Sequence, residues 1–426
     1  MRPSLLNNRL LARRAVLLAG AALPVTAVAQ TAVKPKHPLH KLGTPVPVKP
    51  VTPKKTDPAA TADNGPPAKT PLGPLDTEAR YAIVIDFNSG ATLLDKDADV
   101  SQVPSSLTKM MTAYLVYERL KKGQLSLTQE LPVSEKAWRM QGSKMFVALN
   151  SNVKVEDLIR GMIVQSGNDA CIVLAEGIAG SEQQFVELMN AKAHEFGLTG
   201  TTYHNCTGWP DPGHRMTVRD IATVARRLIA DFPEYYHYDS EKTFKYNGIE
   251  QGNRNTLVQK GVADGLKTGH TEEGGYGLAA SAQRGNRRVI VVVNGLQTMH
   301  GRGEEGERLL DWAFASFENV QLFTAGDVIE KAPVWLGTQP SVPLVGGRDL
   351  VLTLPRNWRD KLKVSVDYDS PIPAPVVRGT RLGTVSVGGD GVPSMSLPLL
   401  AGADVQRLGL AGRSMAVLGR MLAGGG

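Results

Sequence analysis

The chain has 426 residues, a formal net charge of +7, 42% hydrophobic residues and two cysteines. At roughly 150 residues per domain, this length indicates two or three domains, and two cysteines exclude a disulfide scaffold. Residues 1–75 carry 11 Lys and Arg against two Asp and no Glu, so the rest of the chain is close to neutral. A positive field confined to one end argues against nucleic acid as a partner of the folded body.

The first 29 residues have the pattern of an export signal. Four arginines precede an apolar run over 15–28, and Ala27 and Ala29 give the small-x-small pattern of a cleavage site. We therefore expect a secretory signal peptide over 1–29, with an uncleaved N-terminal anchor as the alternative. The pair Arg13 and Arg14 leaves Sec and twin-Arg export both open.

A tether is expected next, over residues 30–75. Residues 31–75 contain 11 Pro and seven Lys, a composition that predicts an extended, disordered segment. Its role is either that of a solvated spacer or that of a basic segment attracted to anionic lipid or wall polymer. The folded body is predicted to start near Asp76.

A hairpin and a helix open this body. Residues 81–86 and 91–94 are rich in β-formers and flank an Asn-Ser-Gly turn, which predicts a β-hairpin. From Ser105 onward, apolar residues recur at helical spacing until Gly123, which suits a helix end.

The start of that helix carries an S-x-x-K motif, Ser106 to Lys109. Residues three apart on a helix share one face, so the Lys amine can reach the Ser hydroxyl. A serine needs a neighbouring base to become a nucleophile, and burial can lower a lysine pKa enough to make it that base. Alone, the pattern is common by chance.

Two further amphipathic helices are expected over 156–178 and 182–197. Ser166, Gly167 and Asn168 offer a hydroxyl and a carboxamide on either side of a glycine. Such a pair can relay a proton and hold a peptide amide, while the alternative is an ordinary turn between helices.

A helix and three strands follow. Thr217 and Asp220 form a weak capping box ahead of a helix over 221–229. Runs of β-formers over 265–271, 276–283 and 287–294 have short connections, so they are expected to pair antiparallel. A helix over 304–317 closes the unit.

The first of these strands carries Lys267, Thr268 and Gly269. A cation and a hydroxyl there can grip a substrate carboxylate, and the glycine lets a peptide lie against the strand edge. The alternative interpretation is an exposed strand end.

After about Asn319 the sequence changes to short alternating stretches separated by Gly and Pro, which predicts a small all-β domain over 321–405. In the last segment, 406–426, apolar residues such as Leu410 and Leu418 share one helical face while Arg413 and Arg420 share another. This pattern fits an amphipathic helix in a membrane interface, but the many glycines also allow a frayed tail.

Together, S-x-x-K, S-x-N and K-T-G in this order are the signature of penicillin-binding proteins and β-lactamases. The sequence around them closely resembles the low-molecular-mass penicillin-binding proteins that are D-alanyl-D-alanine carboxypeptidases, from about residue 79 to 401. The resemblance implies an α+β fold: a β-lactamase/transpeptidase-like catalytic domain over 76–320, with an antiparallel sheet flanked by helices, then a small sandwich-like β domain.

The resemblance also implies catalytic roles. Ser106 would attack the carbonyl between the two terminal D-alanines of a peptidoglycan stem peptide, with Lys109 as its general base. Ser166 would pass the proton toward the leaving amine, and Asn168 would orient the substrate. Water would then hydrolyse the acyl-enzyme.

Substrate-binding residues are implied in the same way. Lys267, Thr268 and Gly269 would lie on the carboxylate side, and the backbone N–H groups of Ser106 and His270 would form the oxyanion hole. Two arginines, Arg254 and Arg302, are weaker candidates for binding the terminal carboxylate, the alternative being ion pairs of structural or surface residues.

No cofactor is expected, and the histidines show no metal-ligand spacing. Cys171 lies three residues after Asn168 and is expected to be a buried thiol, although a disulfide between Cys171 and Cys206 stays open in an exported protein.

The expected partners are stem peptides ending in D-Ala-D-Ala, β-lactam antibiotics as covalent inhibitors and the membrane surface. The expected location is the periplasm, on the outer face of the cytoplasmic membrane. Alternatives on the same site are a D,D-endopeptidase, a β-lactamase or an inactive wall-binding protein. For a class A β-lactamase, no position can be matched with confidence to the deacylating glutamate.

Overall fold

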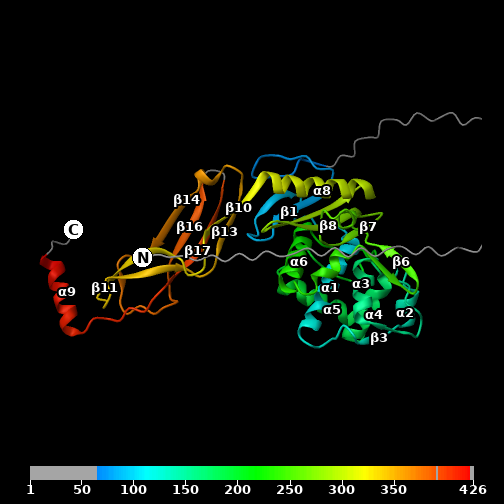
Figure 1. Cartoon of the computed structure of the whole chain (residues 1–426), viewed down its shortest axis with the longest axis horizontal. Coiled ribbons are helices and arrows are strands. Elements are labelled where there is room, and N and C mark those ends of the chain that lie inside the picture. Colours follow the sequence, from blue (N-terminus) through cyan, green and yellow to red (C-terminus); the bar gives the residue numbers. More distant parts are fainter. Residues whose placement is uncertain (1–64, 390–391, 423–426) are drawn as a thin grey trace, which may run out of the picture. The chain divides into compact units, whose positions relative to one another are not determined.

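The computed structural model describes residues 65–389 and 392–422 (Figure 1). The expected signal peptide and most of the expected tether lie outside these residues. The last part of that tether belongs to the folded body, because Ala68 is fully buried and exchanges backbone hydrogen bonds with Leu75. The backbone of Lys69 forms an antiparallel β-bridge with that of Asp95. The folded body therefore begins before Asp76.

The centre of the first domain is an antiparallel sheet of strand order β2-β1-β9-β8-β7. These strands are β1 (Tyr81–Asp86), β2 (Thr92–Lys96), β7 (Thr268–Thr271), β8 (Gly275–Arg284) and β9 (Arg287–Leu296). The predicted hairpin and the three predicted antiparallel strands are confirmed. Because β7 has a neighbour on one side only, its other edge is free to meet the helical part of the domain.

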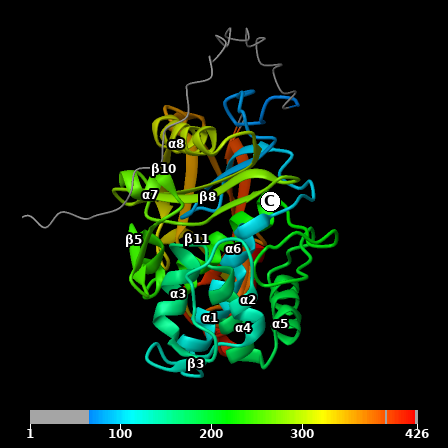
Figure 2. The same ribbon diagram turned by 90° about the vertical axis from the view of Figure 1, so that its right-hand side faces the viewer.

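Helices cover both faces of this sheet. They are η1 (Ser105–Thr108), α1 (Lys109–Lys121), α2 (Glu135–Arg139), α3 (Val155–Ile163), α4 (Asn168–Ala179), α5 (Glu182–Glu195), α6 (Val218–Asp231), η2 (Tyr236–Ser240), α7 (Thr256–Lys260) and α8 (Met299–Ser316). In both views α8 lies on the opposite side of the sheet from α1, α3 and α4 (Figures 1 and 2). Along β1 the buried residues alternate between two apolar cores, Ile83 facing the first and Val84 the second.

Two short hairpins border the helical region: β3 (Glu130–Pro132) pairs with β4 (Asn152–Lys154), and β5 (Thr243–Tyr246) pairs with β6 (Ile249–Gly252). The predicted cap at the start of α6 is confirmed, since the Thr217 hydroxyl accepts a hydrogen bond from the Asp220 N–H at 3.0 Å. The predicted closing helix, α8, starts five residues earlier than expected, where Thr298 caps the N–H of Gly301.

The expectation of one helix over 156–178 is wrong. The chain leaves the helix after α3 and starts α4 at Asn168. Ser166 has a left-handed φ of 60°, and the N–H of Gly167 bonds back to the carbonyl of Gly161. A continuous helix cannot contain this turn. The apolar periodicity nevertheless runs across the break at the polar Ser-Gly-Asn segment, which is why it predicted one helix.

The second domain is all-β, as predicted, and its first strand starts at Phe317. Its elements are β10 (Phe317–Phe323), β11 (Val328–Trp335), β12 (Ser341–Gly346), β13 (Leu350–Pro355), η3 (Arg359–Lys361), β14 (Lys363–Tyr368), β15 (Ile372–Pro373), β16 (Arg381–Gly389) and β17 (Val392–Ala401). A six-stranded sheet, β14-β16-β17-β12-β11-β15, and the pair β10-β13 share one apolar core that includes Val342, Leu344 and Leu399.

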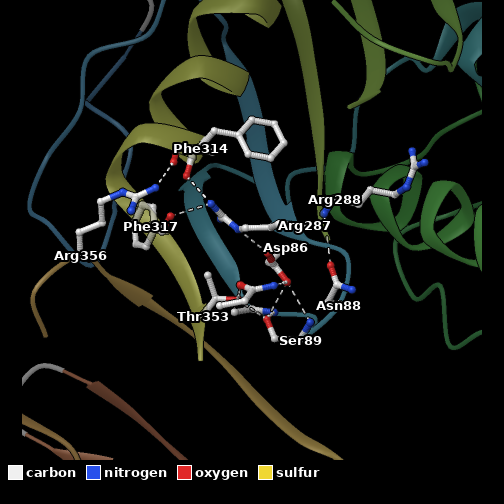
Figure 3. A network of polar contacts seen from close by, with 12 residues as sticks. Asp86, Asn88, Ser89, Arg287, Arg288, Phe314, Phe317, Thr353 and Arg356 are labelled. Atoms are coloured by element: carbon white, nitrogen blue, oxygen red, sulfur yellow. Dashed lines mark hydrogen bonds and ion pairs between the residues drawn. The ribbon is translucent and has the colours of Figure 1, made fainter. Parts of the chain in front are cut away.

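A polar network joins the β1–β2 turn to this domain (Figure 3). The buried Asp86 carboxylate pairs with Arg287 at 2.9 Å and accepts hydrogen bonds from Ser89 and Asn319. The Ser89 hydroxyl lies 2.5 Å from the Thr353 hydroxyl on β13. A buried carboxylate is costly without such partners. Through Arg287 and Asn319, Asp86 links the five-stranded sheet to the first residues after α8.

The chain described ends in α9 (Leu410–Leu422), an amphipathic helix with Leu410, Met415 and Leu418 exposed. Among the described helices, none is both long enough and apolar enough to span a bilayer.

Candidate active site

The S-x-x-K motif lies where a 3₁₀ turn passes into α1. Ser106 belongs to η1 and Lys109 is the first residue of α1. Lys109 is 1% exposed, and its Nζ lies 2.8 Å from Ser106 Oγ, 2.7 Å from Asn168 Oδ1 and 2.6 Å from the Thr207 carbonyl oxygen. The structure thus joins Ser106, Lys109 and Asn168 through one amine.

These three contacts decide how the amine is oriented. The oxygens of Asn168 and Thr207 only accept hydrogen bonds, so they take two N–H bonds of the amine. Burial lowers the pKa of Lys109, an effect that the nearby Cys171 and Cys206 thiols oppose. In the neutral amine, the lone pair then faces the Ser106 hydroxyl, which is the arrangement that a general base requires.

The Thr207 carbonyl is delivered by a loop that the motifs did not identify. The Asn205 side-chain oxygen accepts the N–H groups of Thr207, Gly208 and Trp209 at 3.2, 2.8 and 3.0 Å. Gly208 has a φ of 80°, and a Cβ there would lie 1.8 Å from the Ser105 carbonyl oxygen. In the sequence, this loop is marked only by its glycine, and glycines are too common in loops to indicate a contact with Lys109.

The S-x-N motif sits at the break between α3 and α4. Ser166 is 4% exposed and has a left-handed φ of 60°. The amide of Asn168 is used at both ends, because its Nδ2 donates to the Gln141 carbonyl at 2.7 Å. Sequence reasoning assigned Asn168 to the substrate; in the structure its amide holds Lys109 instead, while Asn168 still lines the cavity.

Asp169, which the motifs did not identify, fixes the segment over 143–147. Its carboxylate accepts the backbone N–H groups of Met145, Phe146 and Val147 at 2.9, 2.9 and 3.2 Å. The N–H of Asn168 bonds to the Ser143 carbonyl at 2.7 Å. The segment over 143–147 is therefore tied to the start of α4 and lies beside the S-x-N motif.

K-T-G lies at the free edge of the sheet. The Lys267 carbonyl accepts the N–H of Ala279 and so faces β8. Because main-chain groups alternate along a strand, those of Thr268 and His270 face the open edge, where a substrate backbone can pair with them. The exposed His270 ring stacks on Tyr276, with ring centroids 3.9 Å apart.

Gly269 lies against the turn that carries Ser106, and this contact also requires a glycine. A Cβ at this position would lie 3.0 Å from the Pro104 carbonyl oxygen and 3.3 Å from the Ser106 nitrogen. The missing side chain therefore lets β7 approach the turn that carries Ser106. The close approach is between two parts of the chain, and it sets the distance between the K-T-G strand and Ser106.

Lys267 is buried, 3% exposed, and burial together with the charge of Lys109 holds the pKa of Lys267 well below its usual value. Its Nζ donates one hydrogen bond within the described residues, to the Thr268 carbonyl at 3.1 Å. Arg302 is buried and donates to the Gly269 and Arg254 carbonyls at 3.4 Å, while the Arg254 side chain is exposed near Gln251. Neither these arginines nor Lys267 and Thr268 are among the residues that line the cavity beside Ser106.

A cavity of about 590 Å³ opens beside Ser106. Ser106, Asn168 and His270 line it, and Trp209 and Glu272 form other parts of its wall. This volume is that of a small-molecule or short-peptide site.

Both cysteines are buried free thiols, so the structure contains no Cys171–Cys206 disulfide. Burial raises the pKa of Cys171 to about 12, which makes it an unreactive thiol. Within the described residues, no three His, Cys, Asp or Glu side chains are grouped so that they could hold a metal ion.

Comparison with known proteins gives two matches that together span most of the chain. Residues 67–298 match the D-alanyl-D-alanine carboxypeptidase family, and residues 317–407 match the C-terminal domain of penicillin-binding protein 5. The chain is 40% identical over 347 residues to the D-alanyl-D-alanine carboxypeptidase DacA of Haemophilus influenzae, covering 80% of this chain and 88% of that protein.

Solved structures agree. Penicillin-binding protein 5 of Haemophilus influenzae is 40% identical with a TM-score of 0.74, over 78% of this chain and 99% of that one. Penicillin-binding protein D2 of Listeria monocytogenes, solved in an ampicillin-bound form, is 30% identical with a TM-score of 0.52, over 56% and 98% of the two chains.

Proposed function

Because the chain belongs to the D-alanyl-D-alanine carboxypeptidase family, we propose that Ser106 carries the acyl-enzyme of that reaction. The protein is a serine-type D-Ala-D-Ala carboxypeptidase, a hydrolase that removes the terminal D-alanine from peptidoglycan pentapeptide stems. The observation that supports the role of Ser106 is its 2.8 Å contact with a buried lysine whose other two contacts are carbonyl oxygens.

In acylation, the Lys109 lone pair takes the Ser106 proton as Oγ attacks the carbonyl of the penultimate D-alanine. The oxyanion that forms lies between the N–H groups of Ser106 and His270, each such donor being worth about 3–4 kcal/mol of barrier. The proton reaches the leaving amine through the hydroxyl of Ser166, a group that can both accept and donate a hydrogen bond. The C–N bond breaks and D-alanine leaves.

In deacylation, a water molecule attacks the ester on Ser106 while Lys109 again accepts a proton. The ester bond breaks, the proton returns to Ser106 Oγ, and the shortened stem is released. Lys109 therefore serves as the base in both halves of the reaction.

The carboxylate of the terminal D-alanine is assigned to Lys267 and Thr268. The spare N–H bonds of Lys267 support this, because a buried ammonium with one hydrogen bond is stabilised by an incoming anion. Arg302 donates a hydrogen bond to the Gly269 carbonyl of β7, so it acts on the substrate only through the position of this strand.

β-Lactams are assigned to the same cavity as covalent inhibitors that acylate Ser106. The existence of an ampicillin-bound form of the Listeria relative supports this assignment. Peptidoglycan stems and β-lactams therefore compete for one serine.

The expected location is the periplasmic face of the cytoplasmic membrane, with residues 1–29 as export signal and α9 as a peripheral anchor. The exposed Leu410, Met415 and Leu418 support an interfacial helix. Deletion of residues 407–426 is expected to shift the protein from the membrane to the soluble fraction of lysed cells. Unchanged membrane association would refute the anchor.

The test of the catalytic proposal is D-alanine release from a pentapeptide, with a cross-linked dimer as second substrate. Ser106→Ala is expected to abolish release and labelling by fluorescent penicillin, whereas Ser101→Ala, at an exposed serine before the motif, is expected to retain both. Release by the Ser106→Ala protein would refute the acyl-enzyme. Faster cleavage of the dimer than of the pentapeptide would instead indicate an endopeptidase.

A further inference from the structure

A buried histidine outside the three motifs contacts the S-x-x-K segment directly. His214 is 2% exposed, and its Nε2 lies 2.8 Å from the Thr108 hydroxyl. Its Nδ1 accepts the backbone N–H of His204 at 3.1 Å. A ring nitrogen that accepts a hydrogen bond carries no proton, so the ring hydrogen is on Nε2 and is donated to Thr108.

The contact joins Lys109 to the loop that serves it. Thr108 directly precedes Lys109, and His214 ends the loop that delivers the Thr207 carbonyl to the Lys109 amine. The base of this loop is closed by backbone hydrogen bonds between Thr202 and Arg215, at 2.8 and 3.0 Å. His214 is therefore placed between the closed base of the loop and the helix that carries the amine.

A second hydrogen bond connects the next turn of α1 to the loop that carries Thr207. The Thr112 hydroxyl donates to the Cys206 carbonyl at 2.7 Å, one residue before Thr207. The position of the Thr207 carbonyl relative to Lys109 is thus held by one side-chain bond from Thr112 and one through His214.

The surroundings keep the His214 ring neutral. Burial lowers the pKa of His214 to about 4, with further lowering from the charges of His204, Arg215 and Lys109 and an opposing effect of Asp211. The His204 ring pairs with Asp211 at 2.7 Å. A second ring proton would place an N–H on Nδ1 against the N–H of His204, so the contact requires the neutral ring.

We propose that His214 is a positioning residue for acyl transfer: it keeps the Thr207 carbonyl on one N–H of Lys109 and thereby keeps the lone pair on Ser106. The inference rests on the proposed role of Lys109 as general base. Displacements of about 1 Å at a reacting centre cost up to about 10²-fold in rate, so loss of the link lowers the chemical rate more than substrate binding.

Two variants of the full chain separate positioning from bulk structure. His214→Ala removes both contacts, while the amide of His214→Gln can donate to Thr108 and accept from His204. For D-alanine release, His214→Ala is expected to lower kcat about tenfold or more with KM changed less than about twofold, and to slow acylation by labelled penicillin equally. His214→Gln is expected to recover most of this loss.

Two further variants, His194→Ala and Thr108→Val, serve as controls. His194→Ala, at an exposed histidine of α5, is expected to match the wild-type protein in both assays. If His214→Ala is insoluble, Thr108→Val removes the same hydrogen bond and keeps the volume of the side chain, and it is expected to show the same fall in kcat. An unchanged kcat in the soluble variant, or a Gln variant no better than Ala, overturns the proposal.

These outcomes are distinct from failure of the catalytic proposal. If Ser106→Ala still released D-alanine, the acyl-enzyme on Ser106 would be refuted whatever the His214 variants did. If Ser106→Ala is inactive and His214→Ala keeps its kcat, only the positioning role is refuted.

Discussion

Two buried lysines, one at the start of α1 and one directly before β7, have opposite hydrogen-bonding environments. Lys109, on the helical side, meets three oxygens at 2.6–2.8 Å. Lys267, on the sheet side, donates one hydrogen bond within the described residues, to the carbonyl of its own neighbour. Burial lowers the pKa of both amines.

The difference indicates which of the two amines still lacks a hydrogen-bond partner in the free enzyme. The contacts of Lys109 are complete without substrate, so its geometry is set in advance, as a base that must act at once requires. Lys267 has N–H bonds to spare in a site where a buried cation without an anion is unfavourable. A substrate carboxylate would supply that anion.

The largest expected effect is that of removing the first amine. Lys109→Met keeps most of the volume but removes the base and leaves the oxygens of Asn168 and Thr207 without a donor. We expect D-alanine release to fall by about 10⁴-fold and acylation by labelled penicillin to fall in parallel. Steady-state rates and the time course of labelling measure both.

The control for this variant is Lys122→Met, an exposed lysine just after α1, which is expected to leave both rates unchanged. A Lys109→Met protein that labels at the wild-type rate would show that Ser106 needs no base from Lys109.

Removing the second amine is expected to have a smaller and more selective effect. Lys267→Met is expected to lower kcat/KM by about 10²-fold for a peptide ending in a free D-Ala carboxylate, because a buried charged hydrogen bond is lost. For the same peptide with a C-terminal amide, the loss is expected to be only a few-fold. The ratio of the two kcat/KM values measures the carboxylate preference.

An equal loss for the acid and the amide would contradict the difference drawn between the two lysines. It would place Lys267 in the chemical step or in the structure of β7, and not on the carboxylate.

Much of this site was predictable from the sequence because its chemistry is concentrated in short segments. Ser106 and Lys109 are three residues apart, so helical geometry alone brings them together. The antiparallel strands could be predicted from alternation and short connections, and the capping of α6 from Thr217 and Asp220.

What could not be predicted are contacts between segments distant in sequence. The Thr207 carbonyl is a backbone group, 98 residues from Lys109, and any residue could supply it. Gly269 is in a recognisable motif, yet the atoms that require a glycine belong to Pro104 and Ser106. Periodicity failed at Ser166, because an apolar repeat does not record a left-handed residue that ends a helix.

The last and smallest expected effect concerns a buried carboxyl near the second lysine. Asp239 is 3% exposed, and its Oδ2 has no hydrogen-bond partner within the described residues. Burial, together with the charge of Asp264, raises the pKa of Asp239 to about 8, and Lys267 opposes this rise. In the folded protein Asp239 is therefore protonated at neutral pH.

The proton on folded Asp239 makes the free energy of unfolding depend on pH. Above about pH 4 the unfolded chain releases the proton that folded Asp239 keeps, so the free energy of unfolding falls as pH rises from about 4 to about 8. Asp239→Asn cannot ionise, so we expect its melting temperature to exceed that of the wild type at pH 8 and to approach it at pH 5. Asp360→Asn, at an exposed position of the second domain, is expected to keep the wild-type pH dependence. Equal slopes for Asp239→Asn and wild type would mean that this carboxyl is ionised in the fold, and Lys267 would then already have an anion beside it before substrate binds.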